Sequence, residues 1–473
     1  MTRSIPLFLL FAAMLHAATL GLEPINIGSR LELFVDNHLA GKFAGDAELH
    51  LHKPEPREVV LVADAPWEGN ISGYFNVFQD GDLYRMYYRG AHAPTPETRG
   101  DYAVACYAES KDAIHWIKPK LGIFEAGGSK GNNIVWPGVM PQGRDGIDWS
   151  ISSFVVFKDL NPNCAEEAKY KAFARHGPTR NSLYAFKSPD GIHWRLMSEA
   201  PVITKGALDS QNVAFWDTVS GRYVAFTRNG RDGFRDIMIQ TSDDFLNWTN
   251  PVFLEYRGAP KEHLYTNAIL PYERAPHILL GFPTRFLPRQ SEQTEPTFMS
   301  SRDGGHTFHR WTEAIIPVTA PEDREGNRSN YMAWGLVELP GNDRQLSMYA
   351  KEAYYEGPGS RLRRFTYRVD GFVSVRAGER GGELVTKPLI FSGDRLVLNF
   401  TTAVAGSIGV ELQDAQGVSI AGYTLDDCEE LTGDDINRVV RWKEGTWLRP
   451  LAGEPVRLRF VLKDADLYSL RFR

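Results

Sequence analysis

Four acidic side chains occupy equivalent places in the sequence, each a few residues before a short run of β-branched and aromatic residues. These acids are Glu68, Asp148, Asp209 and Glu262. Two carboxyl groups that face each other across a pocket can cleave a glycosidic bond, one as the acid and the other as base or nucleophile. The alternative is that each acid forms a structural ion pair. We favour a functional role for the set, because converging like charges are costly without a use.

Basic side chains lie at the ends of the strands that follow. They are Arg89, Arg175, Arg228, Arg285 and Lys351. Arginine makes bidentate contacts with carboxylate or sulfate, so Arg89, Arg228 and Arg285 around one opening would suit an anionic sugar. The alternative is that these arginines only neutralise the neighbouring acids.

Four further side chains are candidate contacts to a sugar: His263, Tyr265, Trp67 and Trp149. His263 adjoins Glu262 and could donate a hydrogen bond to a hydroxyl, or be an ordinary loop histidine. Trp67 and Trp149 could stack on sugar rings or pack between sheets. The fifth run of strand-forming residues is preceded by Asn330 and Tyr331 and has no acid.

Residues 208–229 illustrate the element that must position these side chains. Val213–Trp216 and Tyr223–Thr227 flank a turn rich in Asp, Ser and Gly, which predicts a β-hairpin. Asp209 begins this hairpin and Arg228 ends it. Because antiparallel pairing brings the start of one strand beside the end of the next, we expect both at the same end. Five such hairpins are predicted, with first strands at 74–78, 153–158, 213–216, 267–272 and 335–339.

A second motif recurs in four of these units: a serine, an aspartate two residues later, and an aromatic ring shortly after. Its copies lie at 110–116, 188–194, 242–248 and 301–308. These aspartates could be catalytic acids, but a tight turn packed against the sheet explains a motif that recurs once per unit.

Repeated units of four short strands without helical periodicity indicate a β-propeller. We therefore predict an all-β fold: a five-bladed β-propeller over residues 30–370, followed by a C-terminal β-sandwich over residues 371–473. The last blade would close with Arg361–Val369 and a strand near Phe34. In a propeller the first strands line a central channel, so the four acids would meet at one mouth and the serine–aspartate turns would lie on the opposite face.

Composition and charge narrow the function classes. The chain has 473 residues, of which 42% are hydrophobic, and a net charge of −6. That length allows two or three domains, and the charge gives no basic surface for nucleic acid. The three cysteines are too few and too scattered for a disulfide framework or a metal cluster.

The first 18 residues predict a cleaved signal peptide. Arg3 supplies a positive start, Ile5–Leu15 an apolar run, and Ala17 and Ala18 a small-residue cleavage region. The apolar run is too short to span a bilayer comfortably. We expect a secreted or periplasmic protein without a membrane span, and a monomer or weak oligomer.

Taken together, the hairpins, acids and sandwich resemble the five-bladed propeller glycoside hydrolases, the clan of the family 32 and family 43 enzymes. The resemblance implies one acid from each of the first three blades: a base or nucleophile, a stabilising aspartate and a glutamate general acid. Positions that could correspond are Glu68 or Asp36, then Asp148 or Asp209, then Glu262. The Asn-Asp-Pro-Asn and Arg-Asp-Pro signatures of invertases are absent, and the turn at 301–308 is similar to the Asp boxes of sialidases.

The function we expect is hydrolysis of glycosidic bonds in a poly- or oligosaccharide. Glu262 would be the general acid and Asp209 the base, nucleophile or stabiliser, with Asp148 and Glu68 completing the pocket. No organic cofactor or metal is expected; a structural Ca²⁺ in the channel would suit acid and carbonyl oxygens but is not required. One alternative is a non-catalytic carbohydrate-binding propeller, favoured if Asp209 and Glu262 are buried in ion pairs. Another is a sialidase-like exo-glycosidase, which needs the arginines clustered beside a tyrosine.

Overall fold

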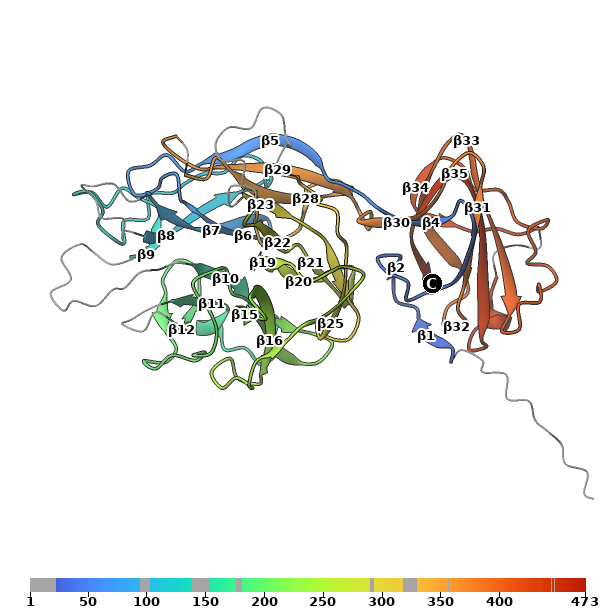
Figure 1. Ribbon diagram of the computed structural model, residues 1–473, viewed down its shortest axis with the longest axis horizontal. Helices are drawn as coiled ribbons and strands as arrows, with labels where there is room; N and C mark the ends of the chain where they lie inside the picture. Colours follow the sequence, from blue (N-terminus) through green and yellow to red (C-terminus); the bar gives the residue numbers. More distant parts are fainter. Residues whose placement is uncertain are drawn as a thin grey trace, which may run out of the picture.

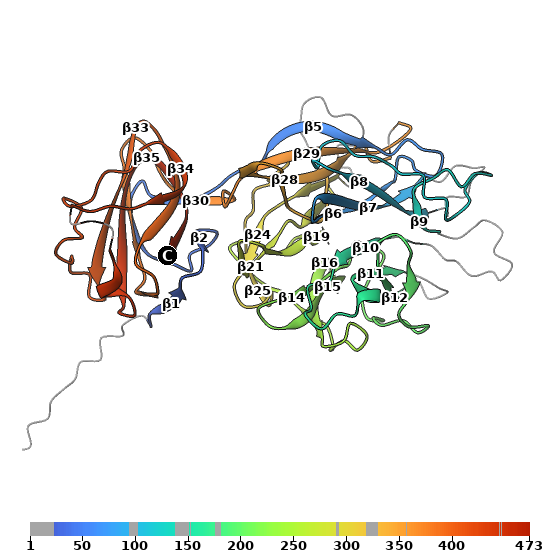
Figure 2. The same cartoon turned by 180° about the vertical axis from the view of Figure 1, so that it is seen from behind.

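The computed structural model describes residues 23–93, 103–137, 151, 153–175, 181–289, 293–317, 330–355, 357–443, 445 and 447–473. These residues form β-strands and two short 3-10 helices, η1 (Glu166–Ala168) and η2 (Arg449–Leu451), and contain no α-helix. The predicted all-β class is therefore confirmed. No helix in these ranges has the length and apolar character needed to cross a membrane. Figures 1 and 2 show two modules side by side, joined near β4 and β30.

The first module begins with three four-stranded antiparallel sheets, each formed by strands consecutive in the chain. The first contains β6 (Gly73–Asp80), β7 (Leu83–Ala91), β8 (Ala103–Ser110) and β9 (Ile134–Trp136). The second contains β10 (Phe154–Lys158), β11 (Tyr170–Arg175), β12 (Leu183–Ser188) and β13 (Arg195–Leu196). The third contains β14 (Val213–Asp217), β15 (Arg222–Arg231), β16 (Phe234–Ser242) and β17 (Val252–Phe253).

The fourth group of strands is divided into two sheets. One contains β18 (Glu255–Arg257), β20 (Ile269–Tyr272), β21 (Ala275–Gly281), β24 (Met299–Ser301) and β25 (Thr307–Arg310). The other contains β19 (His263–Thr266), β22 (Thr284–Leu287) and β23 (Gln293–Pro296). Ala268, with φ of +41°, separates β19 from β20, and Pro283 separates β21 from β22. A proline lacks the N–H that a continuous ladder needs, so it divides the strand here.

The fifth sheet is closed by a strand from the N-terminal part of the chain. It contains β26 (Tyr331–Met332), β27 (Val337–Leu339), β28 (Asn342–Glu352), β29 (Arg361–Arg368) and β5 (Glu55–Val62). The expected closing strand near Phe34 is wrong, because Phe34 belongs to the core of the second module. β5 takes this position by antiparallel pairing with β29.

Hydrogen bonds link the inner edges of these five groups in a closed cycle. In order they are Asn76 Nδ2 to Val156 O, Ser153 Oγ to Ser210 O, Asn267 Nδ2 to Gln211 O, Trp334 Nε1 to Ile269 O, and Val77 N to Trp334 O. The last bond returns to the first sheet. Strands within the ring are covered on both faces, which explains near-continuous buried runs such as β8.

The second module is a single sheet of ten strands around its own hydrophobic core. It contains β1 (Ile25–Gly28), β2 (Glu32–Leu33), β3 (Ala40–Gly45), β4 (Glu48–Leu51), β30 (Val373–Ala377), β31 (Gly382–Thr386), β32 (Leu389–Phe391), β33 (Leu396–Asp414), β34 (Asp434–Val439) and β35 (Val456–Phe472). In β35, buried Val456, Leu458, Phe460 and Leu462 alternate with more exposed residues, as expected when one face of a strand meets a core. Residues 23–51 therefore pair with the C-terminal strands.

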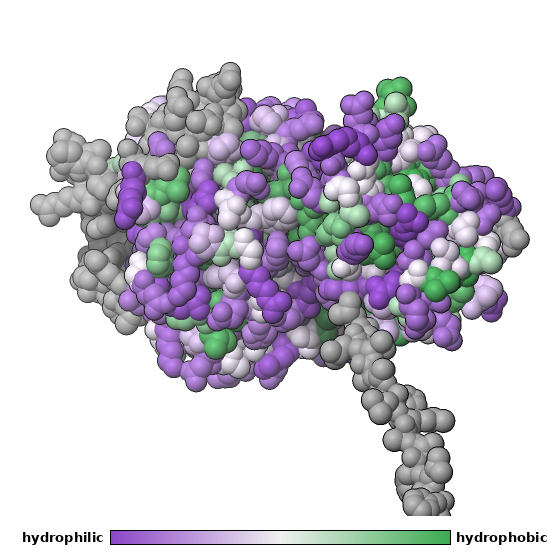
Figure 3. Space-filling model, turned by 45° about the vertical axis from the view of Figure 1, so that its right-hand side comes forward, coloured by the Kyte–Doolittle hydropathy of each residue, from purple (hydrophilic) through white to green (hydrophobic). Residues whose placement is uncertain are grey.

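Polar contacts join the two modules. The Asp370 carboxylate is fully buried and accepts hydrogen bonds from Tyr272 Oη at 2.5 Å in the first module and from Ser469 Oγ at 2.9 Å in the second. Arg368 of β29 donates to Asn399 Oδ1 at 2.9 Å in β33. On the face drawn in Figure 3, hydrophilic residues are spread over both modules. Small groups of hydrophobic residues are scattered among these hydrophilic residues.

The four serine–aspartate turns share one hydrogen-bonding pattern. In the third copy, Ser242 Oγ donates to Asp244 Oδ1 at 3.0 Å. Asp244 Oδ1 also accepts from the backbone N–H groups of Leu246 and Asn247, at 2.8 and 2.7 Å. The Trp248 indole donates to the Phe245 carbonyl at 3.0 Å. The aspartate is occupied in capping its own turn, which is the structural role the sequence pattern predicts.

Candidate functional site

One end of the ring carries a continuous group of charged and aromatic side chains, here called the mouth cluster. Its members come from four of the five strand groups: Tyr74, Arg89, Asp209, Arg228, Tyr265, Tyr331, Lys351 and Tyr354. The contacts run from one member to the next without a break. Segments from distant parts of the chain therefore bring this chemistry together in one cluster.

Asp209 and Arg228 form an ion pair at one end of the third hairpin, which confirms the predicted position of these two residues. The Asp209 side chain is 53% exposed, whereas that of Arg228 is 7% exposed. The Arg228 guanidinium also lies over the Tyr265 ring, 4.9 Å from its centroid. A buried cation thus fixes a carboxylate that remains open to solvent.

Tyr74 of the first sheet contacts Asp209, and Arg89 of the same sheet lies over the Tyr74 ring. Arg89 donates to the Ile71 carbonyl at 2.6 Å, and its guanidinium lies 4.8 Å from the Tyr74 ring centroid. The Tyr74 hydroxyl donates to the backbone carbonyl of Asp209 at 3.4 Å, and burial raises the pKa of this hydroxyl. Tyr74 has φ of +53°, a conformation that residues other than glycine seldom adopt and that is frequent at functional sites.

Lys351 is a buried lysine enclosed by aromatic rings. It is 3% exposed, and its Nζ lies 3.5 Å from the Tyr354 ring centroid and 4.8 Å from that of Tyr331. A Cβ on Gly73 would approach within 3.0 Å of this Nζ, so glycine leaves room for the amine. Among the described residues no carboxylate pairs with Lys351. Burial, and then the charge of Arg89, lower the pKa of Lys351 well below its ordinary value.

His263 and Tyr265 extend the cluster along β19. Tyr265 packs edge-to-face against Tyr331, with ring centroids 5.5 Å apart. The Nδ1 atom of His263 accepts from the Arg235 backbone N–H at 3.2 Å, and burial, followed by the charge of Arg235, lowers the pKa of His263. Arg235 itself lies 5.4 Å from the Tyr265 ring centroid.

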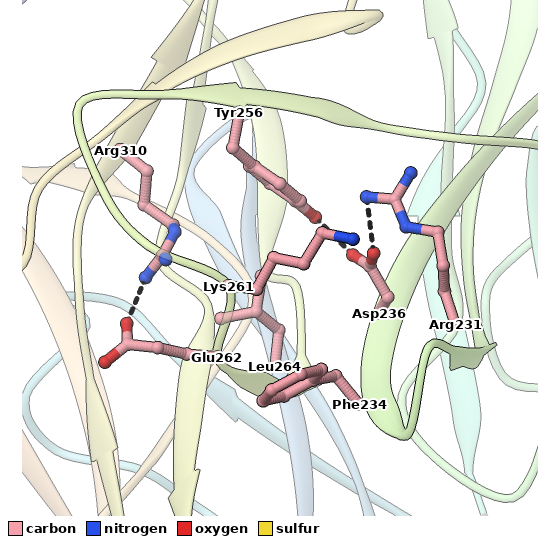
Figure 4. Close-up of a pocket in the computed structure, with 8 residues that line it drawn as sticks. All are labelled: Arg231, Phe234, Asp236, Tyr256, Lys261, Glu262, Leu264 and Arg310. Carbon is pink, nitrogen blue, oxygen red and sulfur yellow. Dashed lines mark hydrogen bonds and ion pairs between the residues drawn. The ribbon is translucent and has the colours of Figure 1, made fainter.

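Glu262 lies in a separate ion-pair network. One oxygen accepts from Arg285 at 2.9 Å and the other from Arg310 at 2.5 Å, and Arg285 also pairs with Glu295. Both oxygens therefore face guanidinium groups. Figure 4 shows Glu262 and Arg310 lining a cavity beside Asp236, and its volume of about 10 Å³ allows little more than one water molecule. No sugar ring fits this cavity as it stands.

Glu68 lies in the interior of the first sheet group. It is fully buried, accepts from Lys118 Nζ at 2.6 Å and also accepts from the Tyr88 hydroxyl. The Trp67 indole donates to Asn133 Oδ1 at 2.7 Å. These contacts give Glu68 and Trp67 structural partners that are not members of the mouth cluster.

The remaining predicted positions are Asp36, Asp148 and Trp149. Asp36 accepts two hydrogen bonds from Arg302 Nε, at 3.1 and 2.9 Å, in the contact between the modules. Asp148 and Trp149 lie outside the described residues. Within the described ranges no group of three His, Cys, Asp or Glu side chains could hold a metal ion.

The structure thus gathers only part of the predicted site. Arg89, Asp209, Arg228 and Tyr265 meet in the mouth cluster, with His263 nearby, whereas Glu262 and Arg285 form their own network. The cluster members not chosen from the sequence are Tyr74, Tyr331, Lys351 and Tyr354. The sequence pattern indicates two of them. Tyr331 precedes the fifth predicted hairpin, at the place where the other units have an acid, and Lys351 ends a strand as Arg89 does.

Searches with the sequence found no matching family model and no matching curated protein. Among solved structures, an N-acetylgalactosamine deacetylase from F. plautii is 11% identical, over 69% of this chain and 97% of that one, with a TM-score of 0.48. A β-1,2-mannobiose phosphorylase from Listeria innocua is 11% identical, over 67% and 96%, with a TM-score of 0.48. A fructofuranosidase from Schwanniomyces occidentalis is 12% identical, over 89% and 96%, with a TM-score of 0.41. With TM-scores this low, the likenesses carry no argument about this chain.

Proposed function

We propose that the chain is a five-bladed β-propeller followed by a β-sandwich, and that it is a secreted glycoside hydrolase of the family 32 and family 43 type. The closed cycle of hydrogen bonds through the five strand groups supports the propeller. The second hydrophobic core, enclosed by one curled sheet, supports the sandwich. Export through residues 1–18 belongs to the same proposal, and the intact mass of the exported protein tests it.

The observation that carries the hydrolase proposal is Asp209 in the mouth cluster. Its carboxylate is half-exposed, is fixed by a buried arginine, and lies beside the tyrosines Tyr74 and Tyr265 of the cluster. In this arrangement Asp209 acts on the glycosidic bond as base, nucleophile or stabiliser. Arg228 orients the carboxylate, and Tyr74 and Tyr265 form the walls of the sugar site.

Hydrolysis needs a second carboxyl group across the bond. Glu262 and Asp148 are the two candidates. For Glu262 to donate a proton, its side chain must first leave Arg285 or Arg310, since both oxygens accept hydrogen bonds from those residues. Substrate binding between the third and fourth strand groups would supply that movement.

One observation favours a second candidate function, a non-catalytic carbohydrate-binding propeller. Glu262 is held by two arginines, and Glu68 is buried against Lys118. Carboxylates fixed in this way stabilise a scaffold without taking part in proton transfer. Under this candidate the mouth cluster binds a glycan and leaves it intact.

Sugar release from a panel of plant and algal glycans separates the two candidates. We expect the wild-type protein to release sugars, and Asp209→Asn and Glu262→Gln each to lose about 100-fold or more in rate. Asp343→Asn, which alters an exposed carboxylate at the start of β28, is the matched control and should keep full activity. Full activity in both site variants contradicts the catalytic proposal. Binding of a glycan without release supports the second candidate.

A further inference from the structure

The mouth cluster contains more positive charge than its described carboxylate can neutralise. Arg89 and Arg228 are its guanidinium cations, Arg235 lies against the Tyr265 ring beside them, and the buried Lys351 amine becomes a further cation when it is protonated. The part of the chain that the structure describes gives these four cations one ion pair, between Arg228 and Asp209. The opening therefore has an excess of cationic groups.

Several of the N–H groups on these cations are buried and unused. Arg228 is 6% exposed, and its Nε and Nη1 have no hydrogen-bond partner among the described residues. The Nε of Arg89 is buried and equally unpaired within those ranges. Native proteins rarely leave buried donors unsatisfied, and removing charged donors from water is unfavourable unless something accepts from them. An acceptor supplied by a ligand would satisfy these donors.

The chemistry of the donors defines that acceptor. Guanidinium groups form paired N–H contacts with the oxygens of a carboxylate or sulfate, and a lysine that takes up a proton beside the anion adds a compact positive charge. Neutral hydroxyl groups would satisfy the hydrogen bonds but leave the excess charge in place.

We propose that the mouth cluster binds the oxyanion of an acidic sugar, a uronic-acid carboxylate or a sulfate ester, through Arg89, Arg228 and Lys351. This inference rests on the function proposed above and names its substrate class. Asp209 repels the ligand anion less than its charge alone suggests, because Arg228 already neutralises it. The anionic group occupies the side of the cluster next to Arg89 and Lys351, and the bond to be cleaved lies beside Asp209.

Calorimetric titration with matched oligosaccharides tests the proposal. One pair is an oligogalacturonate and its methyl ester, and the other is a sulfated oligosaccharide and its desulfated form. We expect at least one charged member to bind about tenfold or more tightly than its neutral partner, with the difference reduced in about 500 mM salt. The pair that shows the difference identifies carboxylate or sulfate as the group. Equal or weaker binding of both charged members overturns the proposal.

Variants localise the effect. Arg89→Gln and Lys351→Met should each lose about tenfold in affinity for the charged ligand and little for the neutral one, whereas Lys351→Arg should retain the preference. Arg222→Gln, which removes an exposed cation paired with Asp243 at the far end of β15, is the matched control. An equal loss in Arg222→Gln contradicts the assignment to the mouth. Tight binding of a charged glycan without hydrolysis would refute the hydrolase alone, and hydrolysis of neutral glycans without any charge preference would refute this inference alone.

Discussion

At the scale of single residues, the contrast between Asp209 and Lys351 defines the mouth cluster. Asp209 is open to solvent and has a cationic partner, whereas Lys351 is buried and has no acidic partner in the described ranges. A buried amine without a counter-charge is destabilising, because its charged form has lost its hydration. Such a residue is retained at a cost in stability, which is common at functional sites.

Lys351→Met should therefore stabilise the free protein. Because burial lowers the folded-state pKa of Lys351, the unfolded chain binds more protons between that pKa and the ordinary lysine value. In that range the wild-type stability rises with pH. Urea unfolding at pH 7 and pH 9.5 should show a smaller rise with pH in Lys351→Met than in the wild type. Lys205→Met, at an exposed position, is the control, and an equal rise in all three proteins would contradict the prediction.

The residue pairs that sequence reasoning found are those within one hairpin. Asp209 lies just before β14 and Arg228 lies in β15, so their meeting follows from the antiparallel pairing of these two strands. The enclosure of Lys351 by Tyr331 and Tyr354 depends on how strand ends are oriented around the ring. Likewise Arg285 and Phe286 are neighbours on β22 and point to opposite faces of the sheet. Which of the two faces the mouth depends on the register of the sheet, and a single sequence does not define that register.

At the scale of elements, buried polar links hold neighbouring sheets together. Lys171 of β11 is 4% exposed and pairs with the buried carboxylate of Asp159. The same carboxylate accepts from the Tyr223 hydroxyl of β15 at 2.7 Å. This group joins the second and third sheets on the side that carries the hairpin turns.

Removing one partner of this link should be strongly destabilising. Lys171→Met leaves Asp159 charged and buried, and we expect a loss of about 3–5 kcal/mol in the free energy of unfolding. Lys187→Met is the matched control, because Lys187 lies opposite Lys171 on β12 and its ion pair with Glu167 is partly exposed. The control should change stability by about 1 kcal/mol or less. Equal losses in the two variants, measured by urea unfolding, would contradict the prediction.

Hairpins and turns were predictable because each is encoded by adjacent residues. The five first strands and the four serine–aspartate turns follow local alternation and turn composition. The division of the fourth group at Ala268 and Pro283 was not anticipated, although Pro283 supplies a local signal for it. The strand that closes the fifth sheet was placed wrongly, because β5 and β29 are distant in sequence and nothing local specifies their pairing.

At the scale of the whole molecule, a buried acid links the modules. Glu32 of β2 is fully buried, and its carboxylate oxygens lie 2.6 Å from both Arg30 Nε and Arg302 Nη1 and 3.2 Å from His277 Nε2. Arg302 and His277 belong to the first module and β2 to the second. Burial opposes ionisation, but the close contact with His277 and the charge of Arg302 outweigh it and lower the pKa of Glu32 to about 2.

Acid should therefore weaken the contact between the modules. The stabilisation from Glu32 is complete above its ordinary pKa and is lost as the pH falls from about 4.5 to about 2, at a cost of about 3 kcal/mol. Glu32→Gln should be less stable than the wild type at pH 6 and should lose less stability between pH 5 and pH 2.5. Glu379→Gln, at an exposed position, should follow the wild type. Parallel stability–pH curves for Glu32→Gln and the wild type would contradict the prediction.

The pairing of residues 23–51 with the C-terminal strands has a consequence for folding during synthesis. β1–β4 leave the ribosome first, but their partners β30, β31, β32 and β35 leave it last. Every residue of the ring is made in between, so the second module cannot complete its core until β35 has been made. Trimming either terminus of the described chain would then remove strands from the same sheet, and the ring would be left as the part able to fold early.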